Sequence, residues 1–84
     1  MNTAFGLMAR FDSPTVHLKD ICKEFFGITP HTAEVQAKAG KLPIPVFKLR
    51  QSEKSPTMVH VDELGNWIDS QRAKARENWD KIHN

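Results

Sequence analysis

The sequence predicts a mainly α-helical fold that carries one small β-hairpin. Three observations support this prediction. Two amphipathic stretches are separated by only three residues, two β-prone runs follow a proline-rich segment, and the last third of the chain keeps a helical spacing of apolar residues. A chain of 84 residues can bury one modest core. We therefore expect a single domain over residues 1–84.

A short helix is expected over residues 2–11, followed by a brief β-prone segment. Phe5, Met8 and Phe11 recur at near-helical spacing, with Leu7 on the other side of the helix. The turn-forming run 12–14 then ends this helix, because it combines aspartate, serine and proline. Residues 15–18 contain threonine and valine and are β-prone but short.

An amphipathic helix follows from Lys19. Apolar residues fall at i, i+3, i+4 and i+7, namely Leu18, Ile21, Cys22 and Phe25. Gly27 can take a positive φ and end this helix, and Ile28 follows it as an apolar residue that can pack against the helix end. Cys22 lies on the apolar side, so we interpret it as a small core residue; the alternative is a reactive thiol.

The next helix is predicted to begin at Pro30 and to run through Ala39 to Gly40. Thr29 can accept hydrogen bonds from the first turn, and proline loses no hydrogen bond at the first helical position. The small Ala33 and Ala37 allow this helix to pack closely on the preceding one. Two helices joined by three residues have the spacing of a helix-turn-helix, over about residues 18–40.

A basic hairpin, or wing, is expected over about residues 45–61. Pro43 and Pro45 exclude helix, and the alternation in residues 46–50 places Phe47 and Leu49 on one face of an edge strand. Lys48 and Arg50 then lie on the other, outward face. A polar loop over residues 51–57 leads to a second strand over residues 58–61.

The chain is predicted to end in a long helix over about residues 62–82, capped by Asp62. Leu64, Trp67 and Ile68 are expected to complete the core against Phe47 and Val59. Trp79 and Ile82 lie much further along the helix and are expected to overhang the domain. For these two residues we expect a partner surface, either in a homodimer or on RNA polymerase; the alternative is a frayed tail.

Composition limits the class of function. The net charge is +2, yet residues 31–54 carry five bases against two acids, which indicates either contact with a polyanion or a solvated face. No long apolar run and no signal-like start is found, so we expect no membrane contact and a cytoplasmic, nucleoid-associated protein. A single cysteine excludes an internal disulfide.

The sequence shows no pattern typical of a catalytic site, a metal site or a cofactor site. Its four histidines and one cysteine do not form a close ligand pair, and no glycine-rich phosphate loop is found. His17 could act as a general base, but it lacks an orienting partner. We therefore predict no enzyme activity, no metal and no cofactor.

The remaining pattern favours a winged helix-turn-helix that binds double-stranded DNA. If Ala33 and Ala37 face inward, the outward side chains of the second helix become candidate DNA contacts. For this helix they are His31, Thr32, Val35, Gln36 and Lys38. For the wing and its approach they are Lys41, Lys48, Arg50, Ser52, Lys54 and Ser55. The alternative is that both segments are simply solvated surface.

Specific stretches also resemble a known family. The run LKDICKEFFGITPHTAEVQAKAGKLP resembles the helix-turn-helix of excisionase-like and MerR-like DNA-binding proteins. Together with FGLMARF, the QSEKS loop and VHVDELGNWIDSQR, it is similar to the pyocin activator protein (PrtN-like) family nearly end to end.

This resemblance implies a transcription activator of prophage or bacteriocin genes that binds short DNA boxes. Two other hypotheses stay open. One is an architectural protein that bends DNA, like an excisionase, and the other is an antirepressor-like protein-interaction module.

Overall fold

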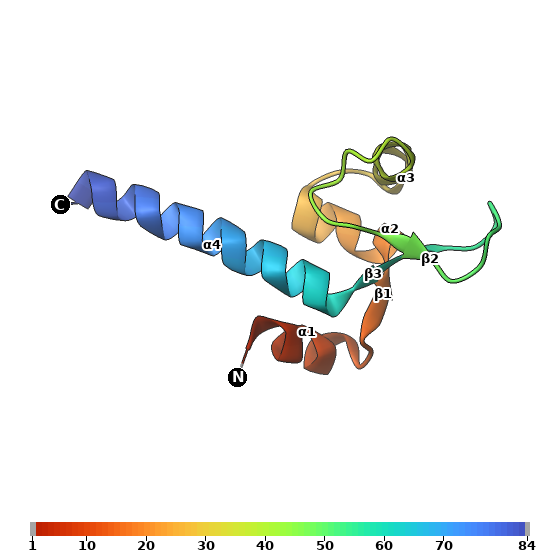
Figure 1. The fold of residues 1–84 in the computed structure, drawn as a ribbon, viewed down its shortest axis with the longest axis horizontal. Helices are drawn as coiled ribbons and strands as arrows, with labels where there is room; N and C mark the ends of the chain where they lie inside the picture. Colours follow the sequence, from red (N-terminus) through yellow and green to blue (C-terminus); the bar gives the residue numbers. More distant parts are fainter. Residues whose placement is uncertain (1, 84) are drawn as a thin grey trace.

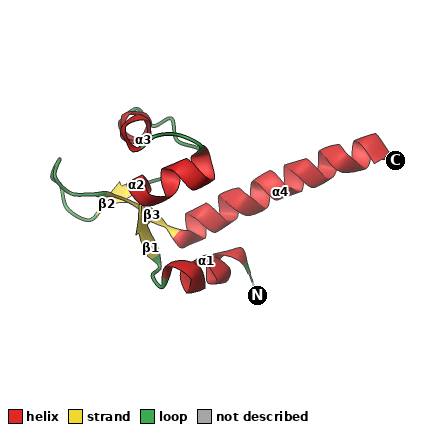
Figure 2. Ribbon diagram, turned by 180° about the vertical axis from the view of Figure 1, so that it is seen from behind, coloured by secondary structure: helices red, strands yellow, loops and turns green. Residues whose placement is uncertain are grey.

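The computed structural model describes residues 2–83 and is mainly helical, with a small antiparallel sheet (Figure 1). The predicted domain limits at Met1 and Asn84 lie outside the described residues. The molecule is elongated, with extents of 52 × 28 × 17 Å, because the long last helix, α4 (Val61–His83), projects from a body formed by the other elements. The described N-terminal residues lie beside the first half of α4 (Figures 1 and 2).

The sheet has three strands in the order β1-β3-β2, all antiparallel. The strands are β1 (Thr15–His17), β2 (Phe47–Lys48) and β3 (Thr57–His60). Val16 pairs with Val59 in the centre of the sheet, and Phe47 pairs with Met58. The β-prone segment after the first helix is therefore an edge strand, and the predicted hairpin is extended by this third strand.

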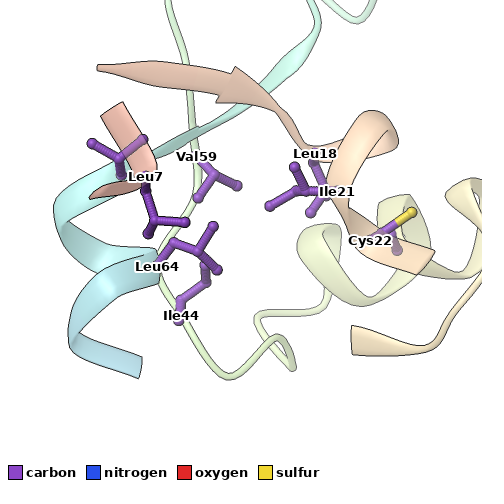
Figure 3. Packing of buried hydrophobic residues seen from close by; sticks show 9 residues of the cluster. Leu7, Leu18, Ile21, Cys22, Ile44, Val59 and Leu64 are labelled. Atoms are coloured by element: carbon purple, nitrogen blue, oxygen red, sulfur yellow. The ribbon is translucent and has the colours of Figure 1, made fainter. Parts of the chain in front are cut away.

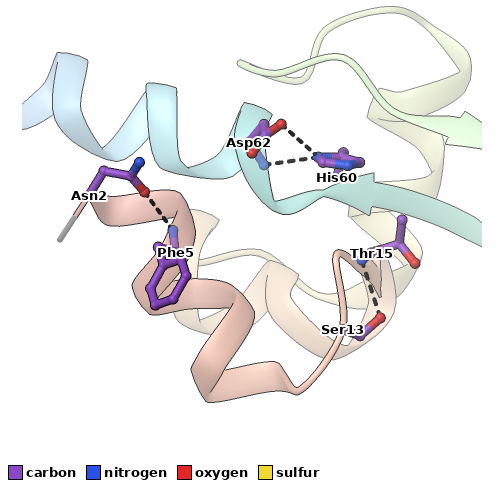
Figure 4. A network of polar contacts seen from close by, with 6 residues as sticks. All are labelled: Asn2, Phe5, Ser13, Thr15, His60 and Asp62. Carbon is purple, nitrogen blue, oxygen red and sulfur yellow. Dashed lines mark hydrogen bonds and ion pairs between the residues drawn. The ribbon is translucent and has the colours of Figure 1, made fainter.

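Helix α1 (Thr3–Phe11) begins where expected and packs on α4. The Asn2 side chain accepts a hydrogen bond from the Phe5 backbone N–H at 2.7 Å, which caps the helix (Figure 4). Leu7 is the buried side chain, whereas Phe5 is 60% exposed. The reason is that α1 meets α4 on its Ala4 side, where Gly65 leaves room for close backbone contact.

The first helix of the predicted pair is divided into a single α-helical turn, α2 (Leu18–Ile21), and a π-helical segment, η1 (Cys22–Phe26). The backbone N–H of Gly27 donates to the carbonyls of Cys22 and Lys23, and its φ of 69° ends the helix as predicted. Cys22 is fully buried, which confirms its interpretation as a core residue.

One hydrophobic core joins the helices to the sheet. In Figure 3, Val59 of β3 lies between Leu7 and Leu64 on one side and Leu18 and Ile21 on the other. Trp67 contributes from α4 through an edge-on contact with Phe26, with ring centroids 5.0 Å apart. The predicted role of Phe47 in this core is wrong: its side chain is 37% exposed.

Helix α4 begins one residue earlier than expected, at Val61, and its cap differs from the prediction. The Val61 N–H donates to the Pro14 carbonyl at 2.9 Å, and the Asp62 N–H donates to the His60 ring nitrogen at 3.0 Å (Figure 4). His60, not Asp62, therefore caps this helix. Strand β3 passes into α4 without a linker.

Candidate nucleic-acid interface

Helix α3 (Pro30–Lys38) is held at the surface by its own cap and by one buried alanine. The Thr29 hydroxyl oxygen accepts a hydrogen bond from the Thr32 N–H at 3.2 Å, and Pro30 occupies the first helical position, as predicted. Ala33 is fully buried and Ala37 half-buried, so this face packs on the body. The opposite face of α3 is open to solvent.

The outward side chains of α3 fall into two groups. His31, Val35 and Lys38 are exposed, and the Val35 side chain is 53% accessible. Thr32 and Gln36 are half-buried. The Thr29 hydroxyl donates to the Thr32 hydroxyl at 3.0 Å, so Thr32 also helps to hold the first turn.

Glu34 connects α3 to the sheet. Its carboxylate accepts a hydrogen bond from the buried Thr57 hydroxyl at 3.0 Å. This contact joins the middle of α3 to the first residue of β3. The position of α3 relative to the hairpin is thus fixed by a side-chain bond as well as by packing.

The face of β2 that points toward α3 is the opposite of the one predicted. Lys48 pairs directly with Thr57, and directly opposed residues of an antiparallel pair lie on the same face of the sheet. Because Thr57 faces α3, Lys48 lies on the α3 side, and Phe47 lies on the outer side. The alternation correctly separated these two residues but assigned the wrong one to the inside.

A groove between α3 and the hairpin results from this arrangement. It has a volume of about 260 Å³ and is lined by residues of α3, β2 and β3 and by Val46, which precedes β2. They are Glu34, Ala37, Lys38, Val46, Phe47, Lys48 and Thr57. Two cations from different elements, Lys38 and Lys48, therefore line one groove, with Glu34 held by Thr57.

The predicted strand over residues 46–50 is shorter than expected, so Arg50 does not share a strand face with Lys48. Strand β2 ends at Lys48, and the Ser52 N–H donates to the Arg50 carbonyl at 2.9 Å in a turn that replaces the ladder. Leu49, the next residue, is 72% exposed. Residues 49–56 form the hairpin loop.

The hairpin loop gathers most of the predicted wing residues around one open hollow of about 700 Å³. Its lining comprises Arg50, Gln51, Ser52, Lys54, Ser55 and Pro56. Arg50 and Lys54 are exposed, while the Ser52 hydroxyl accepts a hydrogen bond from the Lys54 N–H at 3.2 Å and shapes the loop. Lys48 donates from Nζ to the Ser52 carbonyl at 3.5 Å.

Lys41 follows α3 at an exposed position. Its backbone N–H donates to the Gln36 carbonyl at 2.8 Å, and Gly40 takes a φ of 68° to allow this turn. Lys38 and Lys41 therefore lie close to the C-terminus of α3. Both α3 and the hairpin loop project from the end of the molecule opposite to the C-terminal end of α4 (Figure 1).

The outer part of α4 is distant from these elements. Trp79 is 53% exposed and Ile82 78% exposed, so both overhang the body as predicted. The Trp79 ring stacks on His83 with centroids 4.1 Å apart, and the Arg76 guanidinium lies 5.6 Å from its centroid.

One ion pair ties α1 to η1, outside the α3 surface. Arg10 donates from both terminal nitrogens to Glu24, at 2.7 and 2.5 Å, and its guanidinium also lies over the Phe25 ring. The hydrogen bonds from Arg10 hold the pKa of Glu24 below its ordinary value, and the same bonds raise the pKa of Arg10. This pair is structural.

Residues 2–83 offer no cluster of three or more side chains suited to metal binding. Within the same range, none of the helices has the length and apolar character needed to cross a membrane.

Comparison with protein families gives one match. The family model described as pyocin activator protein PrtN matches residues 3–75. The match includes α1, the sheet, α3 and about two-thirds of α4, and it ends before Trp79 and Ile82. Neither a curated protein nor a solved structure matches the chain.

Proposed function

We propose that this chain, which belongs to the pyocin activator protein family, activates transcription of pyocin-type genes by binding duplex DNA. In this proposal the α2–α3 region acts as a helix-turn-helix and the β2–β3 hairpin as its wing. The family is one of regulatory activators, and the surface chemistry supplies a means of reaching DNA.

The observation that carries the proposal is the groove that places Lys38 of α3 and Lys48 of β2 on one surface. Arg50 and Lys54 extend this surface along the hairpin loop, Lys41 lies beyond the C-terminus of α3, and all five are exposed. Lysine and arginine side chains arranged in this way bind successive phosphates and supply affinity without sequence preference.

Sequence preference then comes from α3. His31 and Gln36 hydrogen-bond to base edges in the major groove, and the exposed Val35 contacts a thymine methyl group. Thr32 binds a phosphate at the N-terminal end of the helix, where the helix dipole is positive. Glu34 does not repel the backbone of DNA as strongly as a free carboxylate, because the Thr57 hydroxyl holds it toward the sheet.

Selection of bound fragments from a random duplex pool at about 0.15 M salt tests this proposal, because non-specific binding weakens steeply with salt. We expect enrichment of one short motif. Weak retention of all sequences would favour a DNA-bending protein instead, and no retention would favour a protein-interaction module. A reporter gene placed behind the selected motif then measures activation directly.

A control variant keeps the test interpretable. Lys74→Ala removes one exposed cation on α4, away from α3 and the hairpin loop, and changes the net charge by the same amount as Lys48→Ala does. We expect it to bind the selected motif as the parent does, whereas Lys48→Ala binds more weakly. Equal weakening by both changes would show that only the overall charge matters and would contradict the assigned surface.

A further inference from the structure

The outer half of α4 presents a stripe, apolar except for Arg72, that continues the buried face of the helix. Val61 and Leu64 join the core on this face, and Ile68 is half-buried beside them. The same face then continues with Arg72, Ala75, Trp79 and Ile82, all of them exposed. At 3.6 residues per turn, the five residues from Ile68 to Ile82 fall within a stripe about 80° wide.

The spacing along this stripe is four, three, four and three residues. This alternation is typical of the seam of a two-stranded coiled coil, in which the residues at these positions face a partner helix. Within the part of the chain that the structure describes, the stripe has no covering element beyond Ile68. An exposed helix of this length gains little stability from its own hydrogen bonds in water, so packing against a partner helix would stabilise it.

We propose that the segment of the stripe from Ile68 to Trp79 binds the same segment of a second copy of this chain, in antiparallel orientation. The body of each molecule lies at the N-terminal end of α4 and covers this face there (Figure 1). A parallel pair would bring two bodies to the same place. An antiparallel pair places them at opposite ends of the joined helices.

Charge complementarity selects the register. When Trp79 of one helix lies opposite Ile68 of the other, Arg72 lies opposite the small Ala75, which leaves room for its long side chain. The residues that flank the seam then match as well: Asp69 lies beside Arg76 of the second copy, and the two-fold symmetry repeats this pair. On the other flank, Gln71 lies beside Asn78.

The two charged residues have capacity for this contact. One carboxylate oxygen of Asp69 accepts the Thr3 hydroxyl at 2.5 Å, and the other oxygen is available. Arg76 uses Nε toward Asp80 at 3.4 Å, and its terminal nitrogens are free to donate. In a parallel, in-register pair, Asp69 would lie beside Leu64 and Arg76 beside Gln71, so the charges would gain nothing.

The inference goes beyond the proposed function. The match to the pyocin activator family ends at residue 75, whereas Trp79 and Ile82 follow it. Self-association also needs no DNA, so it is tested on the protein alone. A failure of this inference leaves DNA binding through α3 unaffected, and a failure of DNA binding leaves the pairing of α4 unaffected.

Sedimentation equilibrium of the full chain without DNA, over a wide concentration range, tests the pairing. We expect a reversible equilibrium between monomer and dimer. Trp79→Ala should raise the dimer dissociation constant by about tenfold or more, since the symmetric pair loses two large contacts. Leu49→Ala, a change of another exposed apolar residue, on the hairpin loop, should leave it unaltered. A parent that stays monomeric, or an unaltered Trp79→Ala variant, would overturn the proposal.

A charge exchange tests the register. Arg76→Asp should weaken the dimer by about tenfold, because two attractive pairs become repulsive. Adding Asp69→Arg to the same chain restores the pair and should bring the dissociation constant back to within about threefold of the parent. The single and the double variant both lose the Arg76–Asp80 contact within one chain. A recovery of dimer affinity in the double variant therefore reports a contact between the two copies. Circular dichroism verifies that the helix is intact in each variant. If the double variant has an intact helix but still dimerises as weakly as Arg76→Asp, the antiparallel register is overturned.

Discussion

The contact between α1 and α4 gives a sharp prediction, because two glycines sit in the interiors of these helices with different surroundings. A Cβ atom at Gly6 of α1 would have no neighbour within 4 Å. A Cβ atom at Gly65 of α4 would lie 3.1 Å from the Ala4 nitrogen and 3.2 Å from the Ala4 Cα. The same substitution, glycine to alanine, is therefore expected to have different effects on stability at the two sites.

At Gly6 only the helical preference acts. Alanine in a helix interior is favoured over glycine by about 0.5–1 kcal/mol, so Gly6→Ala should stabilise the fold by about that amount. For a protein of this size, 1 kcal/mol corresponds to a rise in Tm of about 4–8 °C.

At Gly65 the same preference is opposed by a steric cost. The neighbours are backbone atoms of Ala4, which cannot move aside without displacing α1 as a whole. Overpacking of this kind costs about 1–3 kcal/mol, so Gly65→Ala should be neutral or destabilising by up to about 2 kcal/mol. The two variants should differ in free energy of unfolding by about 1–3 kcal/mol.

Urea unfolding followed by circular dichroism measures both variants at one protein concentration. A fixed concentration is necessary because association through α4 would add to the apparent stability. If Gly65→Ala stabilises the protein as much as Gly6→Ala does, the close approach of α1 to α4 does not exist in solution, and the account of why Leu7 rather than Phe5 is buried fails with it.

Three other predictions concern the hairpin, the surface of α3 and acid. Thr57→Val removes the hydroxyl that binds Glu34 but retains the packing of β3 on α4, and it should lower the free energy of unfolding in urea titrations by about 1 kcal/mol. An unaltered free energy of unfolding would mean that the bond is not formed. Replacing Lys48, Arg50 or Lys54 by alanine should weaken binding to all duplexes and lower the magnitude of the log–log salt slope by about 0.9 for each residue. Alanine at His31, Val35 or Gln36 should instead cost about 1–3 kcal/mol of binding free energy, and only on the preferred motif. Fluorescence anisotropy at several salt concentrations separates the two classes, and a change of sequence preference in the hairpin variants would reverse the assignment. Arg10 lowers the folded-state pKa of Glu24, so the contribution of this ion pair to stability is present above the ordinary carboxylate pKa and is lost as the pH falls through the lowered value. The free energy of unfolding, measured from neutral to acidic pH, should therefore fall less steeply with acid in Glu24→Gln than in the parent. Curves of equal steepness would contradict this.

Local chemistry could be predicted from the sequence, and contacts distant in the chain could not. The Thr29 cap, the start of α3 at Pro30 and the positive φ of Gly27 depend on neighbouring residues and were confirmed. The pairing of β1 with β3 joins segments about forty residues apart, and no local pattern reports it. The cap of α4 by His60 was also missed, because histidine is not among the residues that commonly cap helices.

The hairpin shows why the candidate interface could be predicted only in part. Alternation tells which residues share a face, and Phe47 and Lys48 do lie on different faces. Hydrophobicity then favoured Phe47 as the inward residue. In the structure Thr57 binds Glu34 of α3, so α3 lies over the face that carries Lys48. The same face of β3 carries the fully buried Val59, so the packing of β3 in the core, and not the pattern of β2 alone, sets the orientation of the hairpin.

The direct passage from β3 into α4 restricts where this chain can change in length. An extra residue between His60 and Val61 would rotate the whole of α4 by about 100° and shift it by about 1.5 Å relative to the sheet. Gly65 would turn away from Ala4, and the stripe through Trp79 would point elsewhere. The hairpin loop transmits no such rotation, since both of its ends are anchored in one ladder. Insertions and deletions among natural variants should therefore accumulate at residues 51–54 and be absent from the junction at residues 60–61.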